Sequence, residues 1–423
     1  MKKAMLKTTL GLAVTLASSQ LFAAGFALNE QSISGMGTGF AGRSSSADDA
    51  STVYGNPAGM SRIKREQVTG GVAAINAKTD INGRGTFGGS NDGDMVPVVA
   101  VPMGYYVKPI DDHWAFGFGM YAPFGLVTDY ESGFAGRYWG DKSQVQVVTL
   151  QPTVSYAFND RVSIGFGPTI NRIDGELTSA TLTAATPGRN DGKVKIKGDD
   201  TALGFNVGVL VQATDSTRLG LTYHSKVKYK LDGDTKIQGV GFGPFNGRKF
   251  DASLDISTPE SVDFSVTHEL NEDWTLYAGS TWTRWSRLDE IRVENSGVPV
   301  QLGGAAGPIG TITEEQDWHD TWSHAIGAAY KLNKQWTLRT GFSVDQSPTN
   351  NVNRSPRIPT GDRKAISFGA GWSPTDDLTI DFAYSYLKED DAKINLVSAT
   401  KGAYQAKYEN SAHGFGVGAT YRF

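Results

Sequence analysis

Large apolar residues alternate with small or polar residues along much of this chain, and this period-two pattern constrains its fold most. The alternation is clearest in four runs, 114–120, 203–212, 336–345 and 378–386. A period of two is typical of β-strands with two different faces. The second face carries mainly Gly, Ser, Thr and Asn rather than Lys and Glu. Such a face fits a crowded polar lumen better than bulk water, so we expect the apolar face to contact lipid, as in outer-membrane barrels.

Short turns and long polar loops alternate between these runs. Six short turns containing Asn or Asp lie at 110–114, 158–162, 214–218, 270–274, 332–336 and 374–378. Long polar segments lie at 177–199, 232–258, 291–317 and 346–362. Six turns separate seven hairpins if both chain ends lie in the periplasm. The sequence therefore predicts an all-β fold, a 14-stranded antiparallel transmembrane β-barrel over residues 66–423.

The end of the chain supports a barrel independently. Residues 415–423 alternate apolar and small or polar side chains and finish on Phe423. A terminal aromatic on an amphipathic strand resembles the signal of barrels inserted by the outer-membrane assembly machinery. We therefore expect that machinery as a partner, and a location in the cell outer membrane in contact with lipopolysaccharide and other outer-membrane lipid.

The composition excludes several classes of function. The 423 residues include no Cys, which excludes disulfide frameworks and thiolate sites, and a net charge of −4 argues against nucleic acid. The six His show neither triad nor metal spacing, and no G-x-S-x-G occurs, so we expect no enzyme, metal or cofactor. The mean hydropathy of −0.31 excludes long apolar helices but not a barrel, because half of each strand faces the lumen.

The N-terminus has the parts of an export signal. Three Lys within the first seven residues precede an apolar stretch at 10–17, and Leu-Phe-Ala at 21–23 fits a cleavage site. We expect residues 1–23 to be a signal peptide. Residues 24–65, rich in Gly, Ser, Ala and Asp, are not strand-like. Their G-x-G-x-x-G at 37–42 follows no strand, which argues against a dinucleotide site. We expect this segment to plug the lumen.

Several segments carry a family resemblance. The mature chain opens with Ala-Gly-Phe-Ala-Leu-Asn-Glu at 24–30, and Asn-Pro-Ala follows at 56–58. Together with segments at 134–138, 339–348 and 354–363, they resemble the FadL-type long-chain fatty acid transporters of Gram-negative outer membranes. The resemblance implies a monomeric barrel closed by an N-terminal hatch. It also implies loop capture of a hydrophobic substrate, a lumenal binding site, hatch rearrangement, and lateral release through a gap at a kinked third strand.

The resemblance places the lateral gate at five residues. It implies that Asn56, Pro57 and Ala58 of the hatch meet the kinked third strand at Gly125. The residues permit a kink there, because Pro123 cannot donate a ladder hydrogen bond and Gly125 has no side chain to obstruct the hatch. Without the resemblance, Pro123 and Gly125 could simply end the strand.

Two further groups of residues are candidates for contact with substrate. Capture candidates are apolar or aromatic side chains in loops that we expect to be exposed: Phe124, Leu126, Val127, Tyr130, Phe134, Tyr138, Trp139, Phe242 and Phe245. Candidates for binding a carboxylate are basic side chains that strand parity places in the lumen: Arg363, Arg339 and His319. The arginines could instead pair with Asp345, Asp381 or Asp263.

The substrate itself stays open at this level. The family's own basic residues do not transfer, since 175–179 reads Gly-Glu-Leu-Thr-Ser and His319 stands where a lysine is expected. Long-chain fatty acids are therefore the first hypothesis and monoaromatic hydrocarbons the alternative. A general porin for hydrophilic solutes is a second alternative, which the expected plug disfavours.

Overall fold

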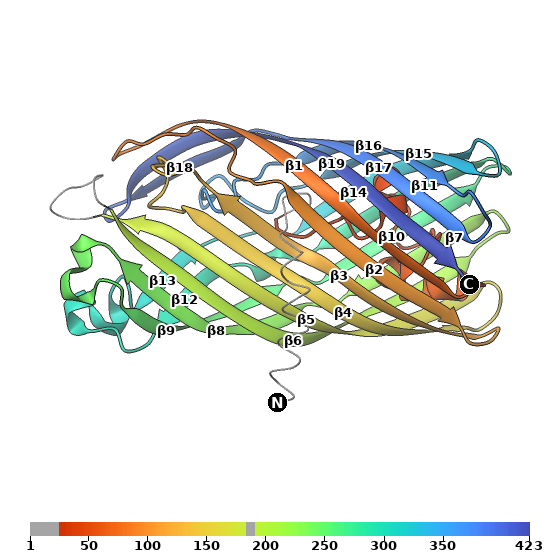
Figure 1. Ribbon diagram of the computed structural model, residues 1–423, viewed down its shortest axis with the longest axis horizontal. Coiled ribbons are helices and arrows are strands. Elements are labelled where there is room, and N and C mark those ends of the chain that lie inside the picture. The colour runs from red at the N-terminus through yellow and green to blue at the C-terminus, as the bar shows by residue number, and fades with distance from the viewer. Residues whose placement is uncertain (1–24, 183–190) are drawn as a thin grey trace.

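The computed structural model describes residues 25–182 and 191–423, which form a closed antiparallel barrel (Figure 1). The sheet contains β1 (Gln67–Gly85), β2 (Val99–Pro109), β3 (Trp114–Asp129), β4 (Lys142–Ala157), β5 (Val162–Thr181), β6 (Gly192–Gln212), β7 (Thr217–His224), β8 (Val227–Gln238), β9 (Lys249–Thr258), β10 (Ser261–Glu269), β11 (Trp274–Thr283), β12 (Glu290–Asn295), β13 (Thr311–Glu315), β14 (Thr321–Lys331), β15 (Trp336–Asp345), β16 (Arg363–Trp372), β17 (Leu378–Glu389), β18 (Ala392–Ser398) and β19 (Gly402–Arg422). The barrel closes where β1 pairs with β19 from Gln67↔Arg422 to Gly85↔Tyr404.

These segments form the predicted fourteen antiparallel strands, because five strands are each interrupted once. The interrupted strands consist of β7 with β8, β9 with β10, β11 with β12, β13 with β14, and β17 with β18. Closure leaves no exposed sheet edge between the first and last strands, as a membrane-spanning sheet requires. The predicted 14-stranded transmembrane barrel is confirmed.

The outer surface of the barrel carries the apolar phase of the alternation. Phe118 on β3 is 39% exposed and Phe205 on β6 is 40% exposed, whereas the neighbouring Gly117 faces inward against Met60. The same pattern continues on β15, β17 and β19. Exposed aromatic and aliphatic side chains along every side of a closed barrel are typical of contact with hydrocarbon.

Six tight turns join the strands at one end of the barrel, where the C-terminus also lies (Figure 1). In four of them the first Asn or Asp accepts the N–H groups two and three residues later, and these residues are Asp111, Asn159, Asn271 and Asn333. The side chain thereby satisfies backbone donors that the turn leaves free. This explains why Asn and Asp mark these positions.

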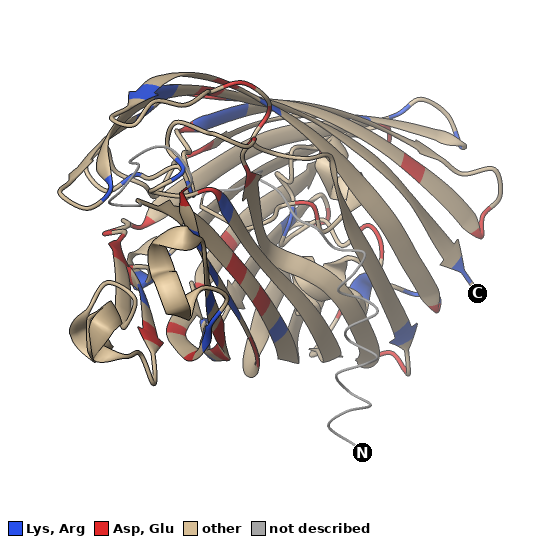
Figure 2. Cartoon of the chain, turned by 60° about the vertical axis from the view of Figure 1, so that its left-hand side comes forward, with Lys and Arg blue, Asp and Glu red and all other residues tan. Residues whose placement is uncertain are grey.

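Hairpins at the opposite end extend well beyond the apolar band. The expectation of long loops there is wrong for three of the four segments. Much of 177–199, 232–258 and 291–317 is paired strand: β5 with β6, β8 with β9, and β12 with β13. In Figure 2, blue and red segments, which mark Lys or Arg and Asp or Glu, are frequent along these extensions. These strands were not predicted because hairpins in water need no apolar face, so their sequences lack the alternation of apolar and polar residues.

The N-terminal segment, residues 25–65, lies inside the barrel and is called the hatch below (Figure 1). It contains the short helices α2 (Ile33–Gly37), α3 (Thr52–Gly55) and η1 (Pro57–Arg62). No helix in the described ranges is long and apolar enough to cross a membrane. The short helices η2 (Val240–Phe245), η3 (Trp285–Arg287), η4 (Val300–Leu302) and η5 (Gly304–Ala306) lie outside the hatch. The expected signal peptide, residues 1–23, falls outside the described residues.

Wall glycines let the hatch backbone touch the barrel wall. A Cβ added to Gly220 would lie 1.8 Å from Ser44 O, and one added to Gly341 would lie 2.1 Å from Thr38 C. Other wall glycines with hatch atoms closer than 3 Å to an added Cβ are Gly71, Gly117, Gly165, Gly208, Gly279, Gly327, Gly369 and Gly414. The lumen-facing glycines of the alternation therefore form the surface on which the hatch packs, and we call these wall glycines the seat of the hatch.

Candidate functional site

The barrel wall is broken beside β3. β2 and β3 pair only from Gly104↔Met120 to Pro109↔Ala115, although β3 continues to Asp129. On its other side β3 shifts register against β4 between Tyr121 and Phe124, which is the geometry of a bulge. The alternation of exposed residues also stops after Met120, since none of residues 121–128 is exposed. The outer half of β3 therefore turns inward from the lipid face.

The start of the hatch occupies the strand edge that β2 leaves free. Leu28 N donates to Pro123 O at 2.8 Å, and Gly125 N donates to Phe26 O at 2.8 Å. Ala27 and Phe124 thus lie opposite each other in a short antiparallel bridge. Because Pro123 has no N–H, it lacks a donor for β2 but still accepts from the hatch. The break in the wall is closed by residues 26–28 rather than by another strand.

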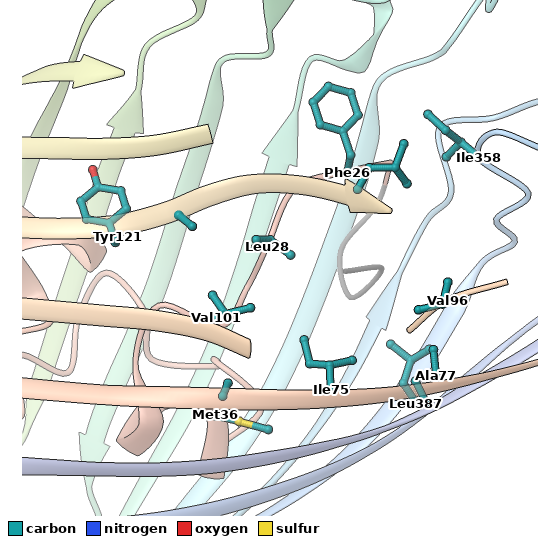
Figure 3. Packing of buried hydrophobic residues seen from close by; sticks show 14 of the residues in the cluster. Phe26, Leu28, Met36, Ile75, Ala77, Val96, Val101, Tyr121, Ile358 and Leu387 are labelled. Carbon is teal, nitrogen blue, oxygen red and sulfur yellow. The ribbon is translucent and has the colours of Figure 1, made fainter. Parts of the chain in front are cut away.

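Aromatic rings hold this closing segment. The Phe26 ring lies 4.9 Å from Trp285 in an edge-on arrangement, 5.7 Å from Phe124 and 6.1 Å from Trp318, measured between ring centroids. Figure 3 shows Phe26 and Leu28 among buried residues of the hatch and wall, including Tyr121 and Val101. Aromatic pairs at such separations stabilise by more than their buried area alone.

The structure places Asn56, Pro57 and Ala58 away from the partner that the family resemblance implied. Asn56 Nδ2 donates to Ser44 O and to Val209 O, at 2.7 and 2.9 Å. Pro57 and Ala58 pack against Gly165, and Asn56 packs against Gly208. The three residues therefore seat the hatch on β5 and β6, whereas Gly125 is bonded to Phe26. A kink was predictable from Pro123, but the hatch residues that meet it were not.

A cavity of about 90 Å³ lies in the lumen beside the broken wall, and we call it the inner cavity. Ala27 and Leu28 of the hatch line it together with Pro123 and Phe124 of β3. The rest of its lining mixes aromatic and small polar side chains, among them Tyr54, Tyr121, Asn171, Asn206, His224, Tyr229, Thr281 and Trp285. The closing segment thus separates this cavity from the break between β2 and β3.

A larger cavity of about 650 Å³ lies among the extended hairpins, and we call it the outer cavity. Its apolar lining comes from several hairpins and includes Leu177, Val194, Ile196, Phe242, Ile291, Val293, Leu302 and Ile312. Arg357, Lys401 and Glu314 also line it, and both cations form ion pairs with Glu314. An apolar groove with cations at its lining suits an apolar molecule with an acidic end.

The outer end of β3 and the loop after it correct the expectation of an exposed apolar patch. Leu126, Val127, Tyr130, Phe134 and Tyr138 are all at least 92% buried. Tyr130 stacks on Phe134 at 3.8 Å, and the Tyr130 hydroxyl donates to Pro356 O. The loop folds back over the lumen and packs there instead of reaching into solvent. Of the nine capture candidates, Tyr138 and Phe242 line the outer cavity, Phe124 lines the inner cavity, and Phe245 and Trp139 are partly buried.

The arginines expected to bind a carboxylate already have acidic partners. Arg339 Nη1 lies 2.6 Å from Asp381, which was one of the alternatives left open, and Arg363 Nε lies 2.7 Å from Glu389. Arg363 still has both Nη atoms buried without a hydrogen-bond partner among the described residues. His319 is exposed between β13 and β14 and does not line the inner cavity, so its expected lumenal position is wrong.

Sequence reasoning overlooked three cations that do line the cavities. Arg357 and Lys401 come from outer loops without a regular pattern. Arg43 lines the inner cavity from the hatch. One signal pointed to Arg43: it is the sole Lys or Arg between residues 24 and 61 of the sequence.

The chain matches the family described as "Outer membrane protein transport protein (OMPP1/FadL/TodX)" over residues 14–423. It belongs to this family. It is 28% identical over 453 residues to the long-chain fatty acid transport protein of Escherichia coli strain K12, covering 99% of this chain and 98% of that protein. It is 29% identical to outer membrane protein P1 of Haemophilus influenzae, covering 90% of each. These relatives and the closed barrel make the chain an outer-membrane transport protein.

Two solved structures have the same fold. A FadL homologue of Pseudomonas aeruginosa superimposes with a TM-score of 0.86 at 26% identity, covering 95% of this chain and all of that chain. The toluene transporter TodX of Pseudomonas putida gives a TM-score of 0.68 at 19% identity, covering 88% of this chain and 94% of that chain. The second likeness concerns the fold alone.

Proposed function

We propose that this outer-membrane transporter imports long-chain fatty acids and releases them sideways through the break beside β3. The observation that carries the proposal is the position of the inner cavity. It is lined by Pro123 and Phe124 at the break and by Ala27 and Leu28 of the hatch segment that closes the break. Relatives named as long-chain fatty acid transport proteins, aligned over nearly the whole chain, support this substrate class.

Capture takes place in the outer cavity. Its apolar lining buries the acyl tail, and each buried CH₂ contributes about 0.8 kcal/mol. Arg357 and Lys401 attract the carboxylate, although their ion pairs with Glu314 limit how tightly it is held. Moderate affinity suits capture, because the substrate must leave again towards the lumen.

Release requires the hatch to rearrange. The inner cavity is much smaller than the outer one, and Ala27 and Leu28 line it while they occupy the free edge of β3. A bound tail that displaces these residues enlarges the cavity and opens the strand edge at Pro123–Gly125 at the same time. The tail then passes into the membrane without crossing water. Asn56, Pro57 and Ala58 contribute by anchoring the rest of the hatch to β5 and β6 while residues 26–28 move.

A disulfide tests this gate directly, because the native chain has no Cys. Ala27 and Phe124 are opposite residues flanked by the two hydrogen bonds, the non-hydrogen-bonded kind of pair whose Cα atoms approach closest. We expect oxidised Ala27→Cys/Phe124→Cys protein to lose uptake of labelled oleate and to regain it on reduction. The single-Cys variants, treated identically, are the controls. Equal uptake by the oxidised and reduced double variant contradicts lateral release at β3.

The same cells separate the alternative substrates. Uptake of toluene but not oleate supports a monoaromatic hydrocarbon channel. Entry of small hydrophilic sugars at a rate that the disulfide does not change supports a general porin. Oleate uptake that responds to the disulfide supports the proposed function.

A further inference from the structure

One cation faces the inner cavity. Arg43 is the single Lys or Arg among the residues that line it, and it comes from the hatch between α2 and α3 rather than from the barrel wall. The Arg43 guanidinium donates from Nη2 to Asn29 Oδ1 and lies 5.4 Å from the centre of the Phe40 ring. Both partners are uncharged.

Arg43 lacks the acidic partner that Arg339 and Arg363 have. Among the described residues it forms no ion pair, whereas Arg339 is bound to Asp381 and Arg363 to Glu389. A guanidinium presents five N–H donors, and a carboxylate accepts two of them in parallel. The bond to Asn29 has a charge on the donor alone, whereas a carboxylate adds an opposite charge and a second parallel bond. Arg43 is therefore a half-buried cation with donors to spare, next to a cavity.

The surroundings define how an acid would lie. Tyr121, Phe124 and Trp285 line the inner cavity with Arg43, so a carboxylate at Arg43 leaves its tail against aromatic side chains near the break in the wall. A second, smaller cavity adjoins the inner cavity, and Arg43 lines both. The second cavity is lined by three acids, Glu30, Asp263 and Asp345, together with Arg363 and Arg43, and Asp345 also lines the inner cavity. Arg43 is thus not the sole countercharge for these acids.

We propose that Arg43 binds the carboxylate of the substrate in the inner cavity and so makes the transporter selective for fatty acids over neutral molecules of the same length. This inference rests on the proposed function, because it takes the inner cavity as the substrate site. It assigns acid recognition to the hatch rather than to the arginines of the wall.

The test compares oleate with oleyl alcohol, which has the same tail and no charge. Both are titrated into the mature protein in lipid nanodiscs, for the wild type and for Arg43→Gln, Arg43→Lys and Arg62→Gln. Arg62 is the control, since it lies in the hatch but bonds to Asp160 O at the short-turn end. We expect Arg43→Gln to weaken oleate binding about tenfold or more without changing the alcohol. Arg43→Lys should restore part of the loss, and Arg62→Gln should change neither.

Each other outcome overturns the assignment. If Arg43→Gln weakens the binding of oleate and of oleyl alcohol equally, or changes neither, then Arg43 does not recognise the carboxylate. The proposed function stands in that case. If the wild type binds neither ligand, the proposed function fails and the role of Arg43 fails with it. Heat-dependent migration in gels reports whether each barrel is folded. Should Arg43→Gln not fold, Arg43→Met, which keeps the packing over Phe40, replaces it with the same expected result.

Discussion

Glu30 is an acid that the hatch carries into an enclosed part of the lumen. It is 3% exposed, and its Oε2 has no hydrogen-bond partner among the described residues. Burial raises the pKa of Glu30 to about 7, although Arg43 and Arg363 attract its ionised form. A buried carboxyl group with this pKa changes charge near neutral pH while the hatch stays in place.

We therefore expect the hatch to be held more weakly as pH rises from about 4.5, the ordinary value, to about 7. In this window the released hatch gives up a proton that the seated hatch retains, so rising pH favours release. Hydrogen exchange of backbone amides near Glu30, corrected for intrinsic rates, measures this at pH 5 and pH 8. Glu30→Gln, which cannot ionise, should show the same protection at both values. An equal pH dependence in the variant would contradict the role of Glu30.

Strand parity predicted which faces the lumenal arginines occupy, but it could not predict their partners. Arg339 on β15 meets Asp381 on β17, two strands away, and Arg363 on β16 meets Glu389 on β17. Such contacts between strands depend on the register, which alternation within one strand does not specify. Arg43 escaped prediction for a related reason, because an irregular segment has no parity to orient its side chain.

The seat between hatch and wall is a property of whole elements, and it depends on strands that lack side chains where the hatch touches them. We expect Gly220→Ala to displace the hatch, since the added Cβ would lie 1.8 Å from Ser44 O. Overpacking of this kind costs about 1–3 kcal/mol. The weaker contact between hatch and wall should appear as faster proteolysis of the hatch and lower oleate uptake, while gels still show a folded barrel.

Gly104→Ala on β2 is the matched control, because a Cβ there has no atom within 4 Å. It adds the same methyl group to another strand of the same sheet. Hatch proteolysis that rises equally in both variants would show that the strands, rather than the seat, are sensitive to alanine.

Strands were predictable within the membrane, where one face must be apolar. They were not predictable outside it, where neither face needs to be apolar. The membrane band of β3, with Trp114 and Phe118 outward, follows from alternation alone. The outer hairpins pair through residues such as Lys195 and Lys236, whose side chains can stay in water. Pro123 signalled a break in pairing, but residues 26–28, nearly a hundred positions earlier, supply the replacement edge. No local pattern encodes a contact over that distance.

At the scale of the whole molecule, the barrel and the hatch are separate structural units. Every strand pairs with its neighbours around the closed sheet, and β1 and β19 join along the full length of β1. The hatch adds only the short bridge at Ala27 and Phe124 to this sheet. Apart from the β3 edge at Pro123 and Gly125, which bonds to the hatch, the strands of the wall therefore pair with one another and not with the hatch.

Removing residues 26–65 should therefore leave a folded barrel with an open lumen. We expect the shortened protein to keep heat-dependent migration in gels and to pass a steady ion current in planar bilayers, while the complete mature protein passes little. The glycines that contact the hatch have no side chains with which to refill the lumen after the deletion. An equal steady current through the complete protein would instead mean that ions bypass the hatch, and the transporter would then resemble a porin.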